Sequence, residues 1–420
     1  MLRALRCTGC GALHPTSARY KCPACGTVLD AEYDADPAAV RALIERAAHA
    51  GSRSLWAFGP LLPVAPEVPP VSLGEGWTPL LPAERSEGWA GLTDLWLKIE
   101  AANPTGSFKD RPVSVALSKA REFGVEGVVT ASSGNAGASV AAYAARAGLP
   151  AVVLVPDGLP SSKLAQIASY GPQLLAVRGH FSRAYDLALA WAESSGWYDV
   201  TTTLLSAFPT EGNKAVAYEL WLQLRRVPDW ILIPVSAGPL LVGIWKGYLE
   251  LKAAGLVDRL PRMVAVQAAG CAPIAKAFAR GDTTVEAWGD PITVASGIRD
   301  PLQGYADDGT LTLRRVRESG GAAIAVTDLE ILNAAEAIAR HEGQAAEPTG
   351  AVAVAGAIAM ARDGRLAPDH SVVCLVTGHG LKDPQAYAEH TAPPVTIEPN
   401  LDSVSRALDV FPHSGGSKEA

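Results

Sequence analysis

The chain has 420 residues, of which 48% are hydrophobic and 19% charged, and its net charge is -7. This composition predicts a globular protein with a large core and excludes a disordered or fibrous one. The charge balance gives no reason to expect a nucleic-acid partner. The apolar stretch from Trp230 to Trp245 is broken by prolines and glycines, so no membrane span is expected. The first residues contain no long apolar run, so we expect no signal peptide and a cytoplasmic protein.

Cysteines near the start of the chain form two C-x-x-C pairs: Cys7, Cys10, Cys22 and Cys25. Two such pairs can wrap four thiolates around one zinc ion. Residues 1–30 are therefore predicted to be a zinc ribbon with a structural Zn²⁺. The alternative is a set of incidental reduced cysteines. Cys271 and Cys374 stand alone and are expected to fill buried apolar positions.

Regular structure is expected from residue 37 onward. A helix is predicted from Pro37 to Ala50, followed by a proline-rich connector that runs over the surface to residue 75. Beyond it, short apolar runs alternate with helical stretches. The predicted strands are Leu95–Ile99, Gly127–Thr130, Ala151–Val155, Gln173–Val177, Trp230–Val235, Met263–Gln267, Ala323–Val326 and Ser371–Val376. This alternation predicts mostly parallel sheets covered by helices on both faces, in two α/β units.

The segment around Lys109 combines a small-residue loop with the start of a predicted helix. Ser107 is expected to cap that helix, and Asp110, three residues later, to complete a capping-box-like arrangement. Lys109 then falls in the first turn, where the helix dipole disfavours a cation and should lower the pKa of the amine. A neutral amine is what Schiff-base chemistry requires. The alternative is an ordinary surface lysine.

Two further small-residue loops each follow a predicted strand and open a helix. Thr130–Gly137 offers serine hydroxyls and backbone N–H groups that suit a carboxylate. Ser236–Leu240 can hold a phosphate, although Pro239 removes one N–H group. Each loop alone also fits an ordinary turn of an α/β protein.

Two polar residues complete the set of motifs. Thr377 follows the last predicted strand and brings a hydroxyl that can hydrogen-bond a ring nitrogen. Glu347 precedes an alanine-rich helix, where the dipole stabilises a carboxylate.

Taken together in their order along the chain, the motifs described above resemble those of threonine synthase and its relatives, the pyridoxal-phosphate enzymes of the tryptophan-synthase-β fold group. The segments that carry the resemblance are Glu75–Leu80, Asn103–Arg111, Ala131–Gly137, Glu347–Ala351 and Thr377–Pro384. The resemblance implies fold type II: two three-layer α/β domains with mostly parallel twisted sheets, preceded by the zinc ribbon. The implied domains are a large cofactor-binding domain, a small α/β domain and a loosely held tail, with boundaries at 31–105 plus 207–385, 106–206 and 386–420.

The resemblance also implies roles for individual residues. Lys109 would hold pyridoxal 5'-phosphate as a Schiff base and act as the base that moves protons. The other implied cofactor-binding residues are Phe108, Asn135, Ser236, Ala237, Gly238, Leu240 and Thr377. The implied ligands of the substrate α-carboxylate are Ser132, Ser133, Asn135 and Ala136.

The resemblance weakens where the substrate's leaving group would bind. Threonine synthases usually carry an arginine for the substrate phosphate at the position of Thr210, and a threonine hydroxyl cannot match that bidentate grip. Lys214 remains and could supply one charge, so it is counted among the substrate-binding residues.

Three functions therefore stay open. The first is a lyase that converts O-phosphohomoserine into threonine and phosphate. The second is elimination or replacement of a β-substituent on a serine or threonine derivative. The third is a zinc-ribbon binding module with a degenerate enzyme body. Either enzyme has a small amino acid as its partner, and a homodimer is a possible assembly.

Overall fold

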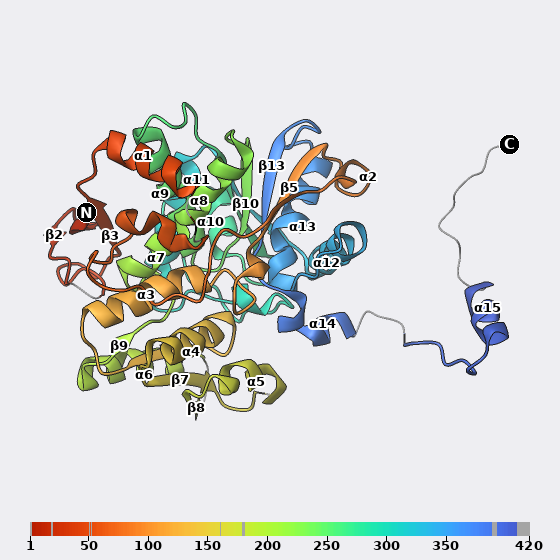
Figure 1. Cartoon of the computed structure of the whole chain (residues 1–420), viewed down its shortest axis with the longest axis horizontal. Coiled ribbons are helices and arrows are strands. Elements are labelled where there is room, and N and C mark those ends of the chain that lie inside the picture. Colours follow the sequence, from red (N-terminus) through yellow and green to blue (C-terminus); the bar gives the residue numbers. More distant parts are fainter. Residues whose placement is uncertain are drawn as a thin grey trace. The chain divides into compact units, whose positions relative to one another are not determined.

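A computed structural model describes residues 2–17, 20–49, 51, 53–159, 161–178, 181–388 and 393–409; for 161–163, 181–182, 388 and 409 it describes the backbone alone. Residues 1–383 form one compact unit and residues 384–420 form a second (Figure 1). The second unit contains α14 (Pro384–Ala388) and α15 (Leu401–Asp409). Residues 389–392 and 410–420 of the predicted tail lie outside the described residues.

The larger sheet of the first unit has six strands in the order β12-β11-β10-β13-β5-β4. Their bounds are β4 (Leu80–Pro82), β5 (Asp94–Ile99), β10 (Trp230–Pro234), β11 (Arg262–Ala268), β12 (Ala322–Val326) and β13 (Ser371–Val376). All neighbours are parallel except β4, which runs antiparallel to β5. The five parallel strands were predicted from their apolar runs; β4 was missed because it is a three-residue edge strand.

The smaller sheet has four parallel strands in the order β8-β7-β6-β9. Their bounds are β6 (Val128–Ala131), β7 (Ala151–Pro156), β8 (Gln173–Val177) and β9 (Tyr198–Asp199). Three of them were predicted, and β9 has only two residues. The predicted strands of both sheets end within one residue of the observed ones.

A third sheet, of three antiparallel strands in the order β2-β1-β3, holds the amino end. Its strands are β1 (Leu2–Cys7), β2 (Leu13–His14) and β3 (Leu29–Tyr33). The ribbon sheet therefore extends three residues beyond the predicted ribbon segment.

The helices complete the first unit. They are α1 (Pro37–Ala47), η1 (Leu55–Leu61), α2 (Ser86–Ala90), η2 (Glu100–Ala102), α3 (Asp110–Glu122), α4 (Asn135–Ala147), α5 (Ser161–Ser169), α6 (Phe181–Ser195), α7 (Ala207–Asn213), α8 (Ala215–Leu224), α9 (Pro239–Ala253), α10 (Pro273–Arg280), η3 (Ser296–Ile298), α11 (Ala306–Glu318), α12 (Asp328–Glu342), α13 (Pro348–Arg362) and η4 (Gly380–Lys382). None of the described helices is both long and apolar enough to cross a bilayer.

Both parallel sheets are covered by helices on two faces. Successive side chains of a strand point to opposite faces, so the apolar strands need cover on both. In the smaller sheet, Val129 and Leu154 pack against α6, whereas Val153 and Val155 pack against α4 and α5. In the larger sheet, residues such as Ile231 and Val373 share a core cluster with α8 and α9, and α13 packs against β10 and β13. The predicted three-layer α/β architecture with mostly parallel sheets is confirmed.

The proline-rich connector departs from the prediction of a surface strap. It contains the 3₁₀ helix η1, in which Leu55, Phe58 and Leu61 are buried in the main core. The indole of Trp56 donates hydrogen bonds to Glu75 (3.0 Å) and Ser114 (2.9 Å). The η1 part of the connector therefore belongs to the core, because its aromatic and leucine side chains bury more apolar surface than a solvated strap would. Farther along, Pro66, Pro69 and Pro70 are exposed, as predicted.

Candidate active site

Lys109 lies immediately before α3 and forms its N-cap, two positions earlier relative to the helix than the predicted cap at Ser107 implies. The predicted cap by Ser107 is wrong: its hydroxyl is buried and has no hydrogen-bond partner among the described residues. Asp110 instead reaches back to Thr105, accepting from its backbone N–H (2.7 Å) and its hydroxyl (2.6 Å), and also accepts from Ser139 (2.7 Å). These contacts fix the start of α3 from both sides of the loop.

The amine of Lys109 is held in a poorly solvated position. Burial lowers its pKa from the ordinary 10.5 to about 8, and the carboxylate of Asp300 opposes that shift. The predicted direction is right, but loss of water and not the helix dipole is the main cause. Nζ donates to the hydroxyl of Thr202 at 2.7 Å and lies 4.9 Å from the centre of the Phe108 ring. An amine with this pKa is partly neutral near pH 7–8 and available as a nucleophile or base.

The loop after β13 is joined directly to the Lys109 loop. The N–H of Phe108 donates to the carbonyl of Thr377 at 3.0 Å, and Ser107 pairs with Gly378 in a short bridge. The hydroxyl of Thr377 is buried and has no partner among the described residues. A buried polar atom of this kind is costly unless a ligand satisfies it.

Glu347 and Asn135 connect the same loop to the smaller sheet. The N–H of Glu347 donates to the carbonyl of Gly378 at 3.0 Å, and its carboxylate accepts from the Asn135 amide at 2.7 Å. A Cβ at Gly378 would lie 2.2 Å from the Glu347 carboxylate, so a larger residue there would displace that carboxylate. Lys109, Thr377, Glu347 and Asn135 are thus brought together by a chain of direct contacts.

The serine loop lies between β6 and α4. Ser132 and Ser133 are partly exposed, and Ala136 is buried in the first turn of the helix. The hydroxyl of Ser132 accepts from the N–H of Gly134 at 3.3 Å, and its carbonyl would lie 2.3 Å from a Cβ at Gly137. Gly137 therefore allows the loop to close onto the helix, which leaves first-turn N–H groups directed at the loop.

The loop 236–240 lies at the carboxyl end of β10, beside the strand that leads to Thr377. Its Gly238 has φ +104°, and a Cβ there would lie 2.1 Å from the hydroxyl of Thr312. That hydroxyl donates to the carbonyl of Ala237 at 2.6 Å and so holds the turn. Leu240 lies in the first turn of α9 after Pro239, where N–H groups lack intrahelical partners.

These residues fit pyridoxal phosphate. The loop 236–240 offers helix-start N–H groups for a phosphate, the unpartnered hydroxyl of Thr377 suits a ring nitrogen, and Lys109 offers an amine with a lowered pKa. The carboxyl ends of neighbouring parallel strands are where open α/β sheets bind ligands.

Lys214 is not joined to this group. Its amine lies 2.8 Å from Glu211 and 2.9 Å from Glu250, and 4.0 Å from the centre of the Tyr33 ring. It lines a cavity of about 220 Å³ with Tyr33, Lys246 and Glu250, and among the described residues none of the other predicted site residues lines that cavity. This placement argues against the predicted role of Lys214 in substrate binding.

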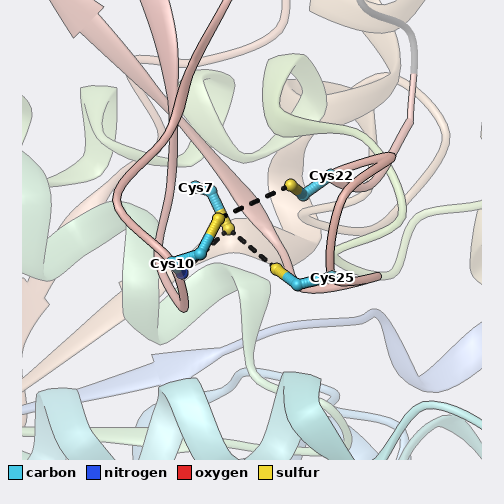
Figure 2. Close-up of side chains that lie close together, drawn as sticks. All are labelled: Cys7, Cys10, Cys22 and Cys25. Atoms are coloured by element: carbon cyan, nitrogen blue, oxygen red, sulfur yellow. Dashed lines mark hydrogen bonds between the residues drawn. The ribbon is translucent and has the colours of Figure 1, made fainter.

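The four amino-terminal cysteines converge from two loops (Figure 2). Their sulfur atoms all lie within 4.8 Å of one another, with Cys7 and Cys25 3.3 Å apart and Cys10 and Cys22 3.9 Å apart. His14 Nε2 also lies 3.3 Å from the Cys22 sulfur. Four thiols at this spacing match a tetrahedral thiolate site. The isolated Cys271 and Cys374 are fully buried, as predicted.

Two residues at the site were missed by the sequence analysis. Thr202 is the hydrogen-bond partner of Lys109, but it lies in a run of three threonines that carries no motif. Asp300 acts on the pKa of Lys109 from a distant part of the sequence. Neither has a local pattern that marks it, because both are brought to the amine by tertiary structure.

The comparisons with known proteins agree with this geometry. The family model described as "Pyridoxal-phosphate dependent enzyme" matches residues 71–378. The chain is 38% identical over 407 residues to threonine synthase of Methanosarcina acetivorans (96% of this chain, 98% of that protein). It is 38% identical over 348 residues to threonine synthase of Mycobacterium tuberculosis (82% and 92%).

Solved structures give the same fold. Maize serine racemase superposes with a TM-score of 0.65 at 25% identity, covering 74% of this chain and 91% of that one. Threonine deaminase isoform 2 of Solanum lycopersicum gives a TM-score of 0.64 at 22% identity, covering 74% and 81%. The chain is a lyase of the threonine synthase type, and it belongs to the family of pyridoxal-phosphate dependent enzymes.

Proposed function

We propose that this protein is a threonine synthase that converts O-phosphohomoserine and water into threonine and phosphate. The observation that carries this proposal is identity of 38% to a threonine synthase along 96% of this chain and 98% of that protein. That match leaves only a few per cent of either chain unaligned. Maize serine racemase, which has the same fold, covers only 74% of this chain.

In this proposal Lys109 holds the cofactor and, when substrate arrives, moves protons at the reacting carbons. When bound, the cofactor supplies an electron sink for the substrate's Cα carbanion. Phe108, Asn135 and Thr377 would hold its ring, and Ser236, Ala237, Gly238 and Leu240 would hold its phosphate. The lowered pKa of Lys109 suits a group that must accept and donate protons near neutral pH.

The amino acid binds beside this group. Its α-carboxylate lies at the start of α4, on Ser132, Ser133, Asn135 and Ala136. Partial exposure of the two serines leaves their hydroxyls accessible, and helix-start N–H groups favour an anion.

The proposal also covers the metal site, the cellular location and the assembly of the protein. Cys7, Cys10, Cys22 and Cys25 bind a structural Zn²⁺, supported by the mutual approach of their sulfur atoms. Metal content of the purified protein tests this, with one zinc per chain expected and none in a Cys22→Ser variant. The enzyme works in the cytoplasm as a homodimer, without nucleic acid or membrane partners.

The test of the reaction is phosphate release from O-phosphohomoserine by the protein loaded with pyridoxal phosphate, with threonine identified as the product. Lys109→Ala is the matched control and should release none. Absence of phosphate release by correctly folded, cofactor-loaded wild-type protein would refute the proposal.

One observation favours a second function, elimination or replacement of a β-substituent on a serine or threonine derivative. Thr210 stands where an arginine for the substrate phosphate is expected, and the amine of Lys214 is already engaged by two carboxylates. A site without these cations suits an uncharged leaving group better than a phosphate. Formation of a 2-oxo acid from serine or threonine, with no phosphate release from O-phosphohomoserine, would select this function.

A further inference from the structure

We propose that the amino-terminal ribbon positions Lys109: Tyr20 and Lys21 anchor segment 198–204, which presents the hydroxyl of Thr202 to the lysine amine. Tyr20 and Lys21 are thus positioning residues that act through Thr202. The inference rests on the proposed role of Lys109 but not on the identity of the substrate.

The first anchor is an ion pair between the ribbon and α11. The amine of Lys21 lies 2.9 Å from both Asp307 and Asp308. The Asp308 side chain is fully buried, and its second oxygen accepts from the backbone N–H of Leu204 at 2.8 Å. Burial raises the pKa of Asp308 to about 6, and Lys21 acts against that shift. Lys21 therefore keeps the carboxylate charged, which strengthens its hold on Leu204.

The second anchor is at the other end of the segment. The N–H of Asp199 donates to the hydroxyl of Tyr20 at 2.9 Å, and the Tyr20 ring stacks on Tyr198 with 6.0 Å between ring centres. Asp199 in turn accepts from the N–H of Thr201 at 2.7 Å. The ribbon thus holds β9 and the first residues after it.

A third contact is apolar. Val28, which follows the second cysteine pair, is buried in a cluster with Leu204, Val242 and Leu311. The ribbon therefore reaches Leu204 twice, through this packing and through the Lys21–Asp308 contact.

Thr202 lies between the two anchored ends. Asp199 and Leu204 are both tied to the ribbon or to its partner carboxylate, so the segment between them has little freedom. Its Thr202 hydroxyl accepts from the Lys109 amine at 2.7 Å. Because Tyr20 and Lys21 immediately precede Cys22, fixing the cysteine cluster fixes the residues that hold this segment.

The first test is amide hydrogen exchange of the cofactor-free protein. Lys21→Met and Tyr20→Phe should each speed exchange within 198–204 by about ten-fold or more, because each removes one anchor. Lys21→Arg should keep the wild-type rate. Arg6→Ala is the matched control: it removes another cation of the ribbon, one that pairs with the partly exposed Glu32, and should leave 198–204 unchanged.

The second test separates positioning from plain stability. In the cofactor-free protein, the pH midpoint for acylation of Lys109 should fall in Lys21→Met by about half a unit or more, because a hydroxyl that accepts from the charged amine favours its protonated form. In a Thr202→Val background the same substitution should cause no further fall. Unchanged exchange in folded Lys21→Met and Tyr20→Phe, or an equal fall in both backgrounds, would overturn the proposal. Neither readout uses a substrate, so both stay valid if the proposed reaction is wrong.

Discussion

Replacing Lys109 with methionine should stabilise the cofactor-free protein near neutral pH. The ordinary pKa of 10.5 falls to about 8 in the folded protein, which corresponds to about 3 kcal/mol of unfavourable burial of the ammonium. Methionine has a similar length and no charge. It loses the hydrogen bond to Thr202, which is worth about 1 kcal/mol. We therefore expect the free energy of unfolding at pH 7 to rise by about 2 kcal/mol.

The stability of the wild-type protein should depend on pH. Between pH 8 and 10.5 the unfolded chain keeps the lysine proton and the folded chain has lost it, so wild-type stability rises with pH across that window. The methionine variant lacks this dependence, so its advantage should shrink above pH 8 by about 1.4 kcal/mol per pH unit, vanish at about pH 9.5 and become a deficit of about 1 kcal/mol above pH 10.5.

The assay is urea unfolding of cofactor-free protein at pH 7 and at several values up to 10, with Lys252→Met as the control. Lys252 is exposed in the last turn of α9, so its replacement should change stability little at any pH. A Lys109→Met protein no more stable than wild type at pH 7, or an advantage independent of pH, would refute the assignment of a buried, destabilised amine.

Three further predictions test the surroundings of this amine. Asp300→Asn should lower the pKa of Lys109 below about 8, because the Asp300 carboxylate raises that pKa. The pH dependence of acylation of Lys109 measures this pKa. An unchanged or higher midpoint would contradict the prediction. Thr377→Val should leave cofactor-free stability nearly unchanged, because its hydroxyl has no protein partner among the described residues, but weaken pyridoxal phosphate binding about ten-fold in a fluorescence titration. Gly238→Ala should abolish cofactor binding, since its Cβ would lie 2.1 Å from the Thr312 hydroxyl and its φ is +104°; wild-type affinity in that variant would show that the loop does not bind the phosphate.

The strands of both parallel sheets could be predicted because buried parallel strands are continuous apolar runs, and this signal is local. The loops at their carboxyl ends followed from the same runs. By contrast, β9 is two residues long and acquires its place through pairing with β6, which no local pattern encodes.

Side-chain direction was the harder part of the site. Ser107 failed as a helix cap because α3 begins two residues later than predicted, with Lys109 as its N-cap. Asp110 finds its partners in Thr105 and Ser139, the latter in a different helix. Lys214 occupies a motif position, yet its amine points to Glu211 and Glu250. Sequence spacing places a residue on an element, but the competing charges around it decide where the side chain goes.

The buried ion pairs next to Lys109 contribute more to positioning the start of α3 than to the stability of the folded protein. Arg111 donates to Glu100 (2.7 Å) and Glu219 (2.6 Å), and Lys98 donates to Glu219 (2.8 Å), with all four side chains fully buried. Apolar residues of similar volume often stabilise a core as well as such a network does.

The network of buried ion pairs fixes the position of the first turn of α3. Arg111 is tied to Glu100 in η2 and to Glu219 in α8, while Asp110 is tied to Thr105 and Ser139. Lys109, directly before them, therefore has its backbone set by its neighbours and not by its own amine. The amine can leave Thr202 for a cofactor without moving the helix, which is the freedom that a lysine needs when it must hold a cofactor and also carry protons.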